Sequence, residues 1–307
     1  MRITNMLRYN RSLDTLERRN SSMSQAHMEL STGRRVSRIS DDPVAGARVL
    51  RLNSEISLIV QHQRNLDSAR TLLSTTEQSL AGIGDLLSEA RGLALQGSGN
   101  TLSQPDRMIV ADQVDQVLER MIAEGNRHFL GRSIFGGSRT DQDPFIVNTD
   151  ENGEVFSVQA NPEGMQGRVT REVNEGENIE VSLPGQAIFM SGGARSETDM
   201  FDLLISLRNG LRSDPDFDSG NLLGRIDTLV DQTAVERSAV GQKLMRLESI
   251  EVNLLDREVE LSDSLSLTRD VDLAKATARW AMEQTAYEAA LRTTASVMSQ
   301  SLMDFLG

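Results

Sequence analysis

Three polar side chains at alternate positions could coordinate a calcium ion. Asn148, Asp150 and Asn152, followed by Gly153, match the first half of a calcium-binding loop. The twelfth position of such a loop is Gln159, which cannot supply the bidentate carboxylate, and the flanking residues alternate as strands do. We therefore interpret the segment as a hairpin turn in which Asn152-Gly153 adopts positive φ, and we predict no metal.

A pair of adjacent carboxylates, Asp41 and Asp42, could act in general acid–base catalysis. No histidine, lysine or nucleophile is placed beside them by the sequence. Ser40 precedes the pair and Pro43 follows it, which is the pattern of a helix start: a capping carboxylate, then proline at the first helical position. We interpret Asp42 as a helix cap.

The remaining residue types give little material for catalysis. The chain has 307 residues and no cysteine, so it lacks a thiolate nucleophile, disulfides and cysteine-based metal sites. Its three histidines, His27, His62 and His128, share no metal-ligand spacing. We predict that the protein is not an enzyme and has no catalytic residue, cofactor or metal.

The charges of the chain are unevenly distributed. The formal net charge is −13, yet the first 52 residues carry ten Arg and five acidic residues. A basic segment with few aromatic residues, interleaved with an apolar seam, favours a charge-matched protein contact over nucleic acid. No uncharged apolar stretch reaches the roughly 18 residues of a membrane span, and residues 1–16 lack the apolar run of a secretory signal.

Most of the chain has the periodicity of long helices, which its aromatic content of 4% also favours. Residues 44–96 carry apolar residues at every seventh position, and helices are also predicted over 103–129, 201–211, 221–267 and 270–307. A first helix ends at Gly33 and has a seam with steps of three and four. That seam comprises Met6, Tyr9, Leu13, Leu16, Asn20, Met23, His27 and Leu30.

The centre of the chain has a different pattern. Between residues 133 and 190 the apolar residues alternate and Gly, Asn and Pro are frequent, which indicates short strands near 145–147, 155–158, 167–173 and 179–183. Because long helices cannot bury their seams alone, the terminal thirds should pack on each other in antiparallel, coiled-coil fashion. The predicted fold is mainly α, a rod of paired helices with a small β insertion at its far end.

Three domains follow from this pattern. Residues 1–43 with 268–307 form a terminal coiled-coil assembly domain, 44–132 with 196–267 form a helical rod, and 133–195 form a β-rich outer domain. The last helix ends with Leu302, Phe305 and Leu306, which a monomer would leave exposed. We expect this segment to become ordered only in an assembly.

Motifs at both ends resemble those of one family. Leu30-Ser-Thr-Gly-Arg-Arg-Val36, followed by Ser40-Asp-Asp-Pro43, resembles the N-terminal signature of the flagellin superfamily. At the other end, Asp270-Val-Asp-Leu-Ala-Lys-Ala276, Gln284-Thr-Ala-Tyr-Glu-Ala-Ala-Leu291 and Ser301-Leu-Met-Asp-Phe-Leu306 resemble the C-terminal signature. Pro43, the passage from Gly131 to Phe145 and the Phe-Leu ending are similar to the hook–filament junction branch.

This resemblance implies a structural adaptor that joins the hook-associated layer to the flagellin filament. The implied partners are flagellin, the other junction hook-associated protein, copies of the same chain, and an export chaperone at the C-terminal helix. The implied location is the extracellular flagellum, reached by the flagellar type III route without a cleaved signal peptide. The expected assembly interface comprises Leu13, Leu16, Met23, Leu30, Arg34, Arg35, Asp41, Asp42, Leu273, Trp280, Tyr287, Leu291, Met298, Leu302, Phe305 and Leu306.

Three other interpretations remain open from the sequence. A minor filament flagellin would polymerise alone, whereas a junction protein should not. A calcium- or carbohydrate-binding surface protein would act through residues 133–195. An intracellular coiled-coil scaffold would be found only in the cytoplasm.

Overall fold

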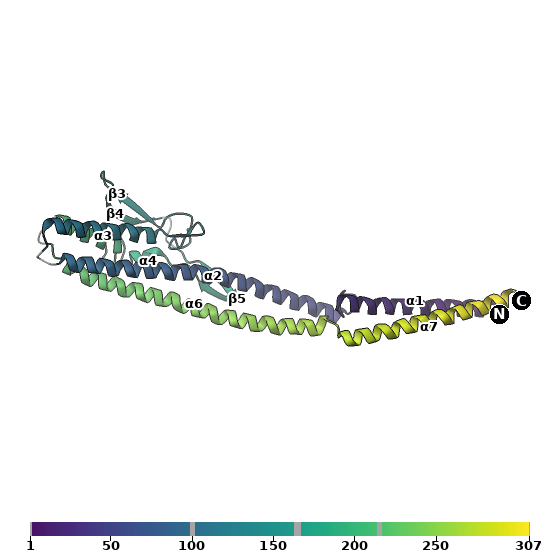
Figure 1. Cartoon of the computed structure of the whole chain (residues 1–307). Coiled ribbons are helices and arrows are strands. Elements are labelled where there is room, and N and C mark those ends of the chain that lie inside the picture. Colours follow the sequence, from purple (N-terminus) through teal and green to yellow (C-terminus); the bar gives the residue numbers. More distant parts are fainter. Residues whose placement is uncertain (1, 99–101, 163–166, 214–216, 307) are drawn as a thin grey trace. The chain divides into compact units, whose positions relative to one another are not determined.

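The computed structural model describes residues 2–98, 102–162, 167–213 and 217–306, and it describes only the backbone of residues 2–6, 8, 9 and 297–306. Its long helices are α1 (Arg2–Thr32), α2 (Pro43–Gly97), α3 (Gln104–Gly125), α5 (Met200–Ser213), α6 (Gly220–Arg269) and α7 (Leu273–Leu306), with a short helix α4 (Gly185–Phe189) (Figure 1). The chain divides into two compact units, residues 1–59 with 255–307 and residues 60–254. The predicted mainly α fold, with antiparallel long helices and a small β insertion, is confirmed.

The predicted heptads of α2 form the buried face of that helix. Leu52, Ile59, Leu66, Leu73, Leu80, Leu87 and Ala94 are all buried. Within the unit of residues 60–254, α6 runs antiparallel to α2 and buries Ile226, Leu229, Val240 and Leu247. Side chains of seven-residue periodicity thus pack between two helices as in a coiled coil.

Ion pairs line the edges of this helix pair. Arg91 Nε lies 2.6 Å from Asp227 Oδ1, and Arg237 Nε lies 2.6 Å from Glu77 Oε1. A third pair joins Arg70 to Glu251. These three contacts connect residues 70, 77 and 91 of α2 to residues 251, 237 and 227 of α6, in the order that fixes the antiparallel register.

Three antiparallel hairpins form the β insertion. Their strands are β1 (His128–Phe129) with β2 (Arg132–Ser133), β3 (Phe145–Thr149) with β4 (Val155–Ala160), and β5 (Thr170–Asn174) with β6 (Glu177–Glu180). The first hairpin was not predicted, because α3 was expected to continue to Phe129. The helix ends earlier because the Asn126 side chain bonds both backbone groups of Phe145, donating to its O and accepting from its N, each at 2.9 Å.

An aromatic cluster holds the β insertion against the helices. Phe135, Phe145, Phe189 and Phe201 are buried, and the ring centroids of neighbouring members lie 5.0 to 5.4 Å apart. They come from the β region, from α4 and from α5, so these segments share one core. Half of the chain's eight Phe residues are in this cluster, which concentrates its large apolar area at one point.

A buried cation connects the same elements. The Arg208 side chain on α5 is 3% exposed. Its Nη1 lies 2.6 Å from Asp115 Oδ1 on α3, and its Nη2 donates to the Val155 carbonyl on β4 at 2.7 Å. One guanidinium therefore connects three elements, as its fixed fork of donors allows.

None of the described helices has the length and apolar character needed to cross a membrane.

The buried carboxylate of Asp199 caps α5. Its Oδ1 accepts from the backbone N of Phe201 and Asp202, each at 3.0 Å, and its Oδ2 accepts from Arg195 N at 2.8 Å. Burial raises the pKa of Asp199, whereas these hydrogen bonds oppose that shift.

We expect Asp199→Ala to lower the free energy of unfolding by about 1–2 kcal/mol, because the cap is lost and the donors are left unpaired. Urea unfolding followed by far-ultraviolet circular dichroism measures this. Asp199→Asn keeps an acceptor and is the matched control. An alanine variant as stable as the wild type would contradict the capping role.

Candidate assembly site

The two terminal helices lie side by side in one unit (Figure 1). They run antiparallel, since the end of α1 is bonded to the start of α7 through the loop between residues 33 and 36. This arrangement places Leu16, Met23 and Leu30 of the expected interface at half-buried positions. Leu13 is also half-buried.

The predicted seam of α1 is wrong at two positions, and the side chains of two further members, Met6 and Tyr9, lie outside the described residues. Asn20 and His27 were expected in the seam, but both are exposed. Ala26 and Glu29 are buried instead. Residues at steps of three and four along a helix are compatible with two choices of buried face that differ by one residue. The face that is buried in the structure contains Ala26, and it also places Glu29 against α7.

An ion pair of unequal exposure fixes this frame. Glu29 has an 8% exposed side chain, and its Oε2 lies 3.2 Å from Arg279 Nη1 on α7. Gln25 also donates to Glu29 Oε1 at 3.2 Å. A second, more exposed pair joins Arg19 to Glu283 at 3.3 Å. A carboxylate this buried is costly unless it is paired, so Arg279 is the partner that permits it.

The expected interface residues of α7 divide into two groups. Trp280 and Tyr287 are half-buried on the same side as the buried Ala276. Leu273 and Leu291 are exposed by 58% and 42%. The side chains of Met298, Leu302, Phe305 and Leu306 lie outside the described residues.

Backbone hydrogen bonds connect the loop after α1 to the segment before α7. Arg35 N donates to Arg269 O at 2.7 Å, and Val271 N donates to Gly33 O at 2.9 Å. Arg35 Nη2 also donates to Thr268 O at 2.7 Å. Gly33 has a φ of +67°, which favours glycine here. We call these two segments, residues 33–36 and 268–271, the clasp.

Arg34 and Arg35, both predicted from sequence, therefore act in one place. Arg34 forms a β-bridge with Asp270. The pKa of Asp270 is lowered, chiefly by the hydrogen bond from Arg269, with a smaller contribution from the charge of Arg34.

The interpretation of Asp42 as a helix cap is confirmed. Asp42 Oδ1 accepts from Ala45 N at 3.0 Å, and α2 begins at Pro43. This hydrogen bond is the main cause of the lowered pKa of Asp42, to which the Arg35 guanidinium at 3.5 Å adds. Asp41 instead accepts from Arg38 N at 2.9 Å. The two carboxylates hold the loop and the start of α2, which are structural roles.

Asp272 performs the same function at the start of α7. Its Oδ1 accepts from Ala274 N at 3.0 Å and Lys275 N at 3.2 Å. The hydrogen bond from Lys275 is the main cause of the lowered pKa of Asp272. Both helices that leave the clasp therefore begin with a capping carboxylate.

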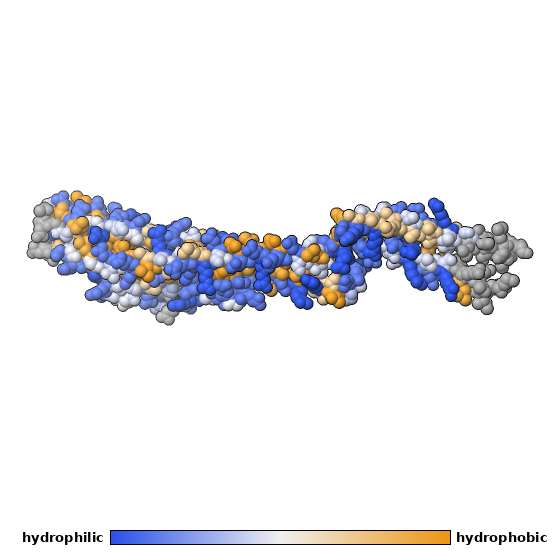
Figure 2. Space-filling view, turned by 90° about the horizontal axis from the view of Figure 1, so that it is seen from below, coloured by the Kyte–Doolittle hydropathy of each residue, from blue (hydrophilic) through white to orange (hydrophobic). Residues whose placement is uncertain are grey.

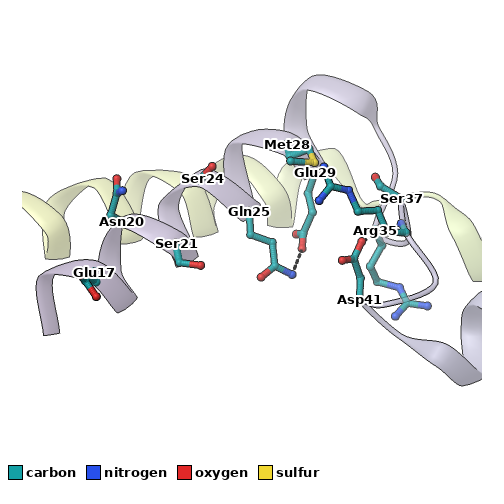
Figure 3. Close-up of a pocket in the computed structure, with 11 residues that line it drawn as sticks. Glu17, Asn20, Ser21, Ser24, Gln25, Met28, Glu29, Arg35, Ser37 and Asp41 are labelled. Atoms are coloured by element: carbon teal, nitrogen blue, oxygen red, sulfur yellow. Dashed lines mark hydrogen bonds between the residues drawn. The ribbon is translucent and has the colours of Figure 1, made fainter. Parts of the chain in front are cut away.

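A polar groove lies between α1 and the loop (Figure 3). Its volume is about 420 Å³. One wall is the face of α1 from Glu17 to Glu29, and the other includes Arg35, Ser37 and Asp41. The lining mixes charges of both signs with serine and amide groups, and it lacks the histidine or cysteine of a nucleophilic site.

The hairpin interpretation of the calcium-like segment is confirmed, but the prediction that both Asn152 and Gly153 adopt positive φ is wrong, because only Gly153 does so. Asp150 Oδ1 accepts from Asn152 N at 2.9 Å and from Glu154 N at 2.8 Å, and Gly153 has a φ of +84°. Asn148 donates instead to Ser157 Oγ at 3.1 Å. Over the ranges that the structure describes, no three acidic or histidine side chains gather as a metal site.

The comparisons with known proteins agree with this architecture. Residues 3–140 match the bacterial flagellin N-terminal helical region, and residues 223–306 match the bacterial flagellin C-terminal helical region. The chain belongs to the flagellin superfamily.

Within that superfamily, the chain is similar to flagellar hook-associated protein 3 of Escherichia coli K12, with 23% identity over 98% of both chains. It is 26% identical to flagellin of Bacillus subtilis 168, over 86% of each. A putative flagellar hook-associated protein from Vibrio parahaemolyticus shares the fold with a TM-score of 0.66 at 21% identity, over 75% of this chain and 99% of that one.

Acid should weaken the clasp and the capped helix starts beside it. Asp42, Asp270 and Asp272 all have a folded pKa below the ordinary 3.8. A lowered pKa adds stability above the unfolded value, and that stability is lost as the pH falls through the folded value. The terminal helix pair should therefore lose stability progressively below a pH of about 4.

Trp280, the single tryptophan of the chain, reports on this unit alone. Urea unfolding followed by its fluorescence at pH 7 and pH 3 measures the effect. The variant with Asp42→Asn and Asp272→Asn keeps cap acceptors that do not titrate, so its stability should change less with pH. Equal pH dependence in both proteins would contradict the prediction.

Proposed function

We propose that this chain is a structural adaptor of the bacterial flagellum that joins the hook-associated layer to the flagellin filament. The observation that carries the proposal is similarity over nearly the whole chain to hook-associated protein 3, together with both flagellin terminal regions. Its relatives are structural flagellar proteins, and we propose that it is likewise not an enzyme.

The parts of the chain have separate roles in this proposal. Residues 1–43 with 268–307 form the assembly domain, 44–132 with 196–267 form the rod that contacts neighbouring subunits, and 133–195 form an outer β-rich domain. The support is chemical: few of the described side chains of the terminal pair are buried, and its α7 face leaves Leu273 and Leu291 exposed. Such a face gains apolar burial when subunits assemble.

The partners follow from this placement. The relatives are components of the flagellum, so the partners are hook and filament proteins, and we propose flagellin, the other junction hook-associated protein and copies of this chain. We also propose export through the flagellar type III route, with a chaperone on the C-terminal helix beforehand. The absence of cysteine suits passage of an unfolded chain, because no disulfide needs to form or break.

The alternatives are less well supported. The match to hook-associated protein 3 covers 98% of that chain, whereas the match covers 86% of Bacillus subtilis flagellin and 28% of Salmonella derby flagellin. A calcium-binding role would need free ligands in the β3–β4 turn, where Asp150 already bonds the backbone.

The adaptor role is tested by deleting the gene in its flagellated host. We expect hooks without filaments and unpolymerised flagellin in the medium, since the filament has no layer to grow on. Re-expression of the wild-type chain should restore filaments. Filaments that persist after the deletion would contradict the adaptor role and favour a redundant flagellin.

The apolar end of α7 gives a second prediction. Removing residues 299–307 should abolish incorporation into flagella, because Leu302, Phe305 and Leu306 are then lost to the assembly. The unit of residues 60–254 should remain folded, as judged by helical circular dichroism. Asp304→Asn is the matched control and should incorporate normally. A truncated chain that still assembles would exclude this role for the last turns.

A further inference from the structure

The long helices carry a second seam on the face opposite their buried one. On α2, Val44, Ala47, Arg51, Ser54 and Leu58 follow one another at steps of three and four, on the side away from the buried Leu52 and Ile59. Val44 is 82% exposed and Leu58 is 57% exposed. We call these five residues the basic stripe, since its one charge is that of Arg51.

A corresponding seam lies on α6. Asp256, Val259, Asp263 and Leu267 also follow at steps of three and four, on the side away from the buried Leu265. Val259 is 61% exposed and Leu267 is 86% exposed. We call these four residues the acidic stripe. Both stripes belong to the unit of residues 1–59 with 255–307.

The charges within the stripes have no counterpart in the same chain. Within the described ranges, Arg51, Asp256 and Asp263 form no ion pair, and all three are exposed. Other Arg residues of these helices do pair internally, as Arg70 does with Glu251. The face seen in Figure 2 carries apolar patches separated by hydrophilic residues.

Each stripe alone is an unfavourable surface. Regular steps of three and four with apolar residues form the contact face of a coiled coil, whereas a face exposed to water needs no such order. A charge at a seam position weakens apolar packing but specifies which partner fits. The two stripes are opposite in charge.

We propose that the basic stripe of one copy packs against the acidic stripe of a second copy. This inference rests on the proposed adaptor function and identifies the surfaces through which subunits of one layer meet. When the two helices pack antiparallel with Val44 against Leu267, Arg51 falls between Asp256 and Asp263 and can pair with either. These two carboxylates lie seven residues apart, about 10 Å along the helix.

The contact has a direction. It uses one surface on the first copy and a different surface on the second, so the first copy keeps a free acidic stripe and the second a free basic stripe. Such a heterologous contact produces a ring or a helical layer, not a closed pair. A layer within a tubular filament requires this geometry.

Charge reversal tests the pairing in flagella isolated from a flagellated host that lacks its own copy of this protein. Arg51→Glu alone should lower incorporation at least about tenfold, the factor that corresponds to a loss of 1.4 kcal/mol. The pair Asp256→Arg with Asp263→Arg should do the same, because each places like charges opposite each other. The chain with all three changes should regain incorporation to within about twofold of the wild type, a difference well under 1 kcal/mol.

Co-expression gives an independent arm. A host that makes the Arg51→Glu chain and the double-arginine chain together can alternate them, so that every contact joins opposite charges. We expect flagella from this host to contain both chains, although neither incorporates alone. Arg257→Glu is the matched control, because this exposed residue neighbours Asp256 but lies outside the stripe. It should incorporate like the wild type.

The outcomes separate the inference from the proposed function. If the wild-type chain is absent from flagella, the proposed function fails. If the wild type incorporates and the reversed chains do so equally well, the pairing is wrong. The pairing is also wrong if the reversed chains fail and neither the triple variant nor co-expression restores them. Circular dichroism and urea unfolding of each purified variant confirm that these surface changes leave the fold intact.

Discussion

An amphipathic helix of thirty or fifty residues has no interior of its own, and the rest of this structure follows from that constraint. Its apolar seam is stable only against another helix. The chain reverses direction, so that α6 packs against α2 and α7 packs against α1. In the clasp, backbone hydrogen bonds of Gly33, Arg35 and Val271 hold the segment after α1 against the segment before α7.

Arginine supplies most of the specificity along these seams. The chain has only two lysines, Lys243 and Lys275, among its 32 basic residues. A planar guanidinium can pair with a carboxylate and a carbonyl at once, as Arg35 does in the clasp and Arg208 does among α3, α5 and β4. Exposed ion pairs contribute little stability each. Their regular placement instead selects one register between helices that could otherwise slide.

The sequence predicted the long helices and the caps because these depend on neighbouring residues. Leu66, Leu73 and Leu80 define the buried face of α2 without knowledge of its partner. The phase of α1 could not be predicted in this way. Its two possible frames place either Ala26 or His27 in the seam, and the choice depends on Arg279, some 250 residues away. Local periodicity does not contain that information.

In the candidate site, too, features that depend on neighbouring residues were predicted, and features that depend on residues distant in sequence were not. Arg34, Arg35 and Asp42 were identified from the family motif and from capping rules, and the structure brings them together at the clasp. Glu29 and Arg279 were missed, because a charge in a helical sequence usually indicates a solvated face. The aromatic cluster and the end of α3 at Gly125 were also missed, since both depend on Phe145 meeting residues distant in sequence.

The clasp also makes the chain between residues 36 and 268 a closed loop. For a flexible loop, the entropy of closure grows only with the logarithm of its length, so doubling the length costs about 0.6 kcal/mol. Segments inserted in the β-rich part, far along the chain from both ends, therefore have little thermodynamic effect on the terminal helices. The central part of such a protein is free to diverge in size and sequence. The two terminal helices are constrained, because each must keep the apolar face that packs against the other.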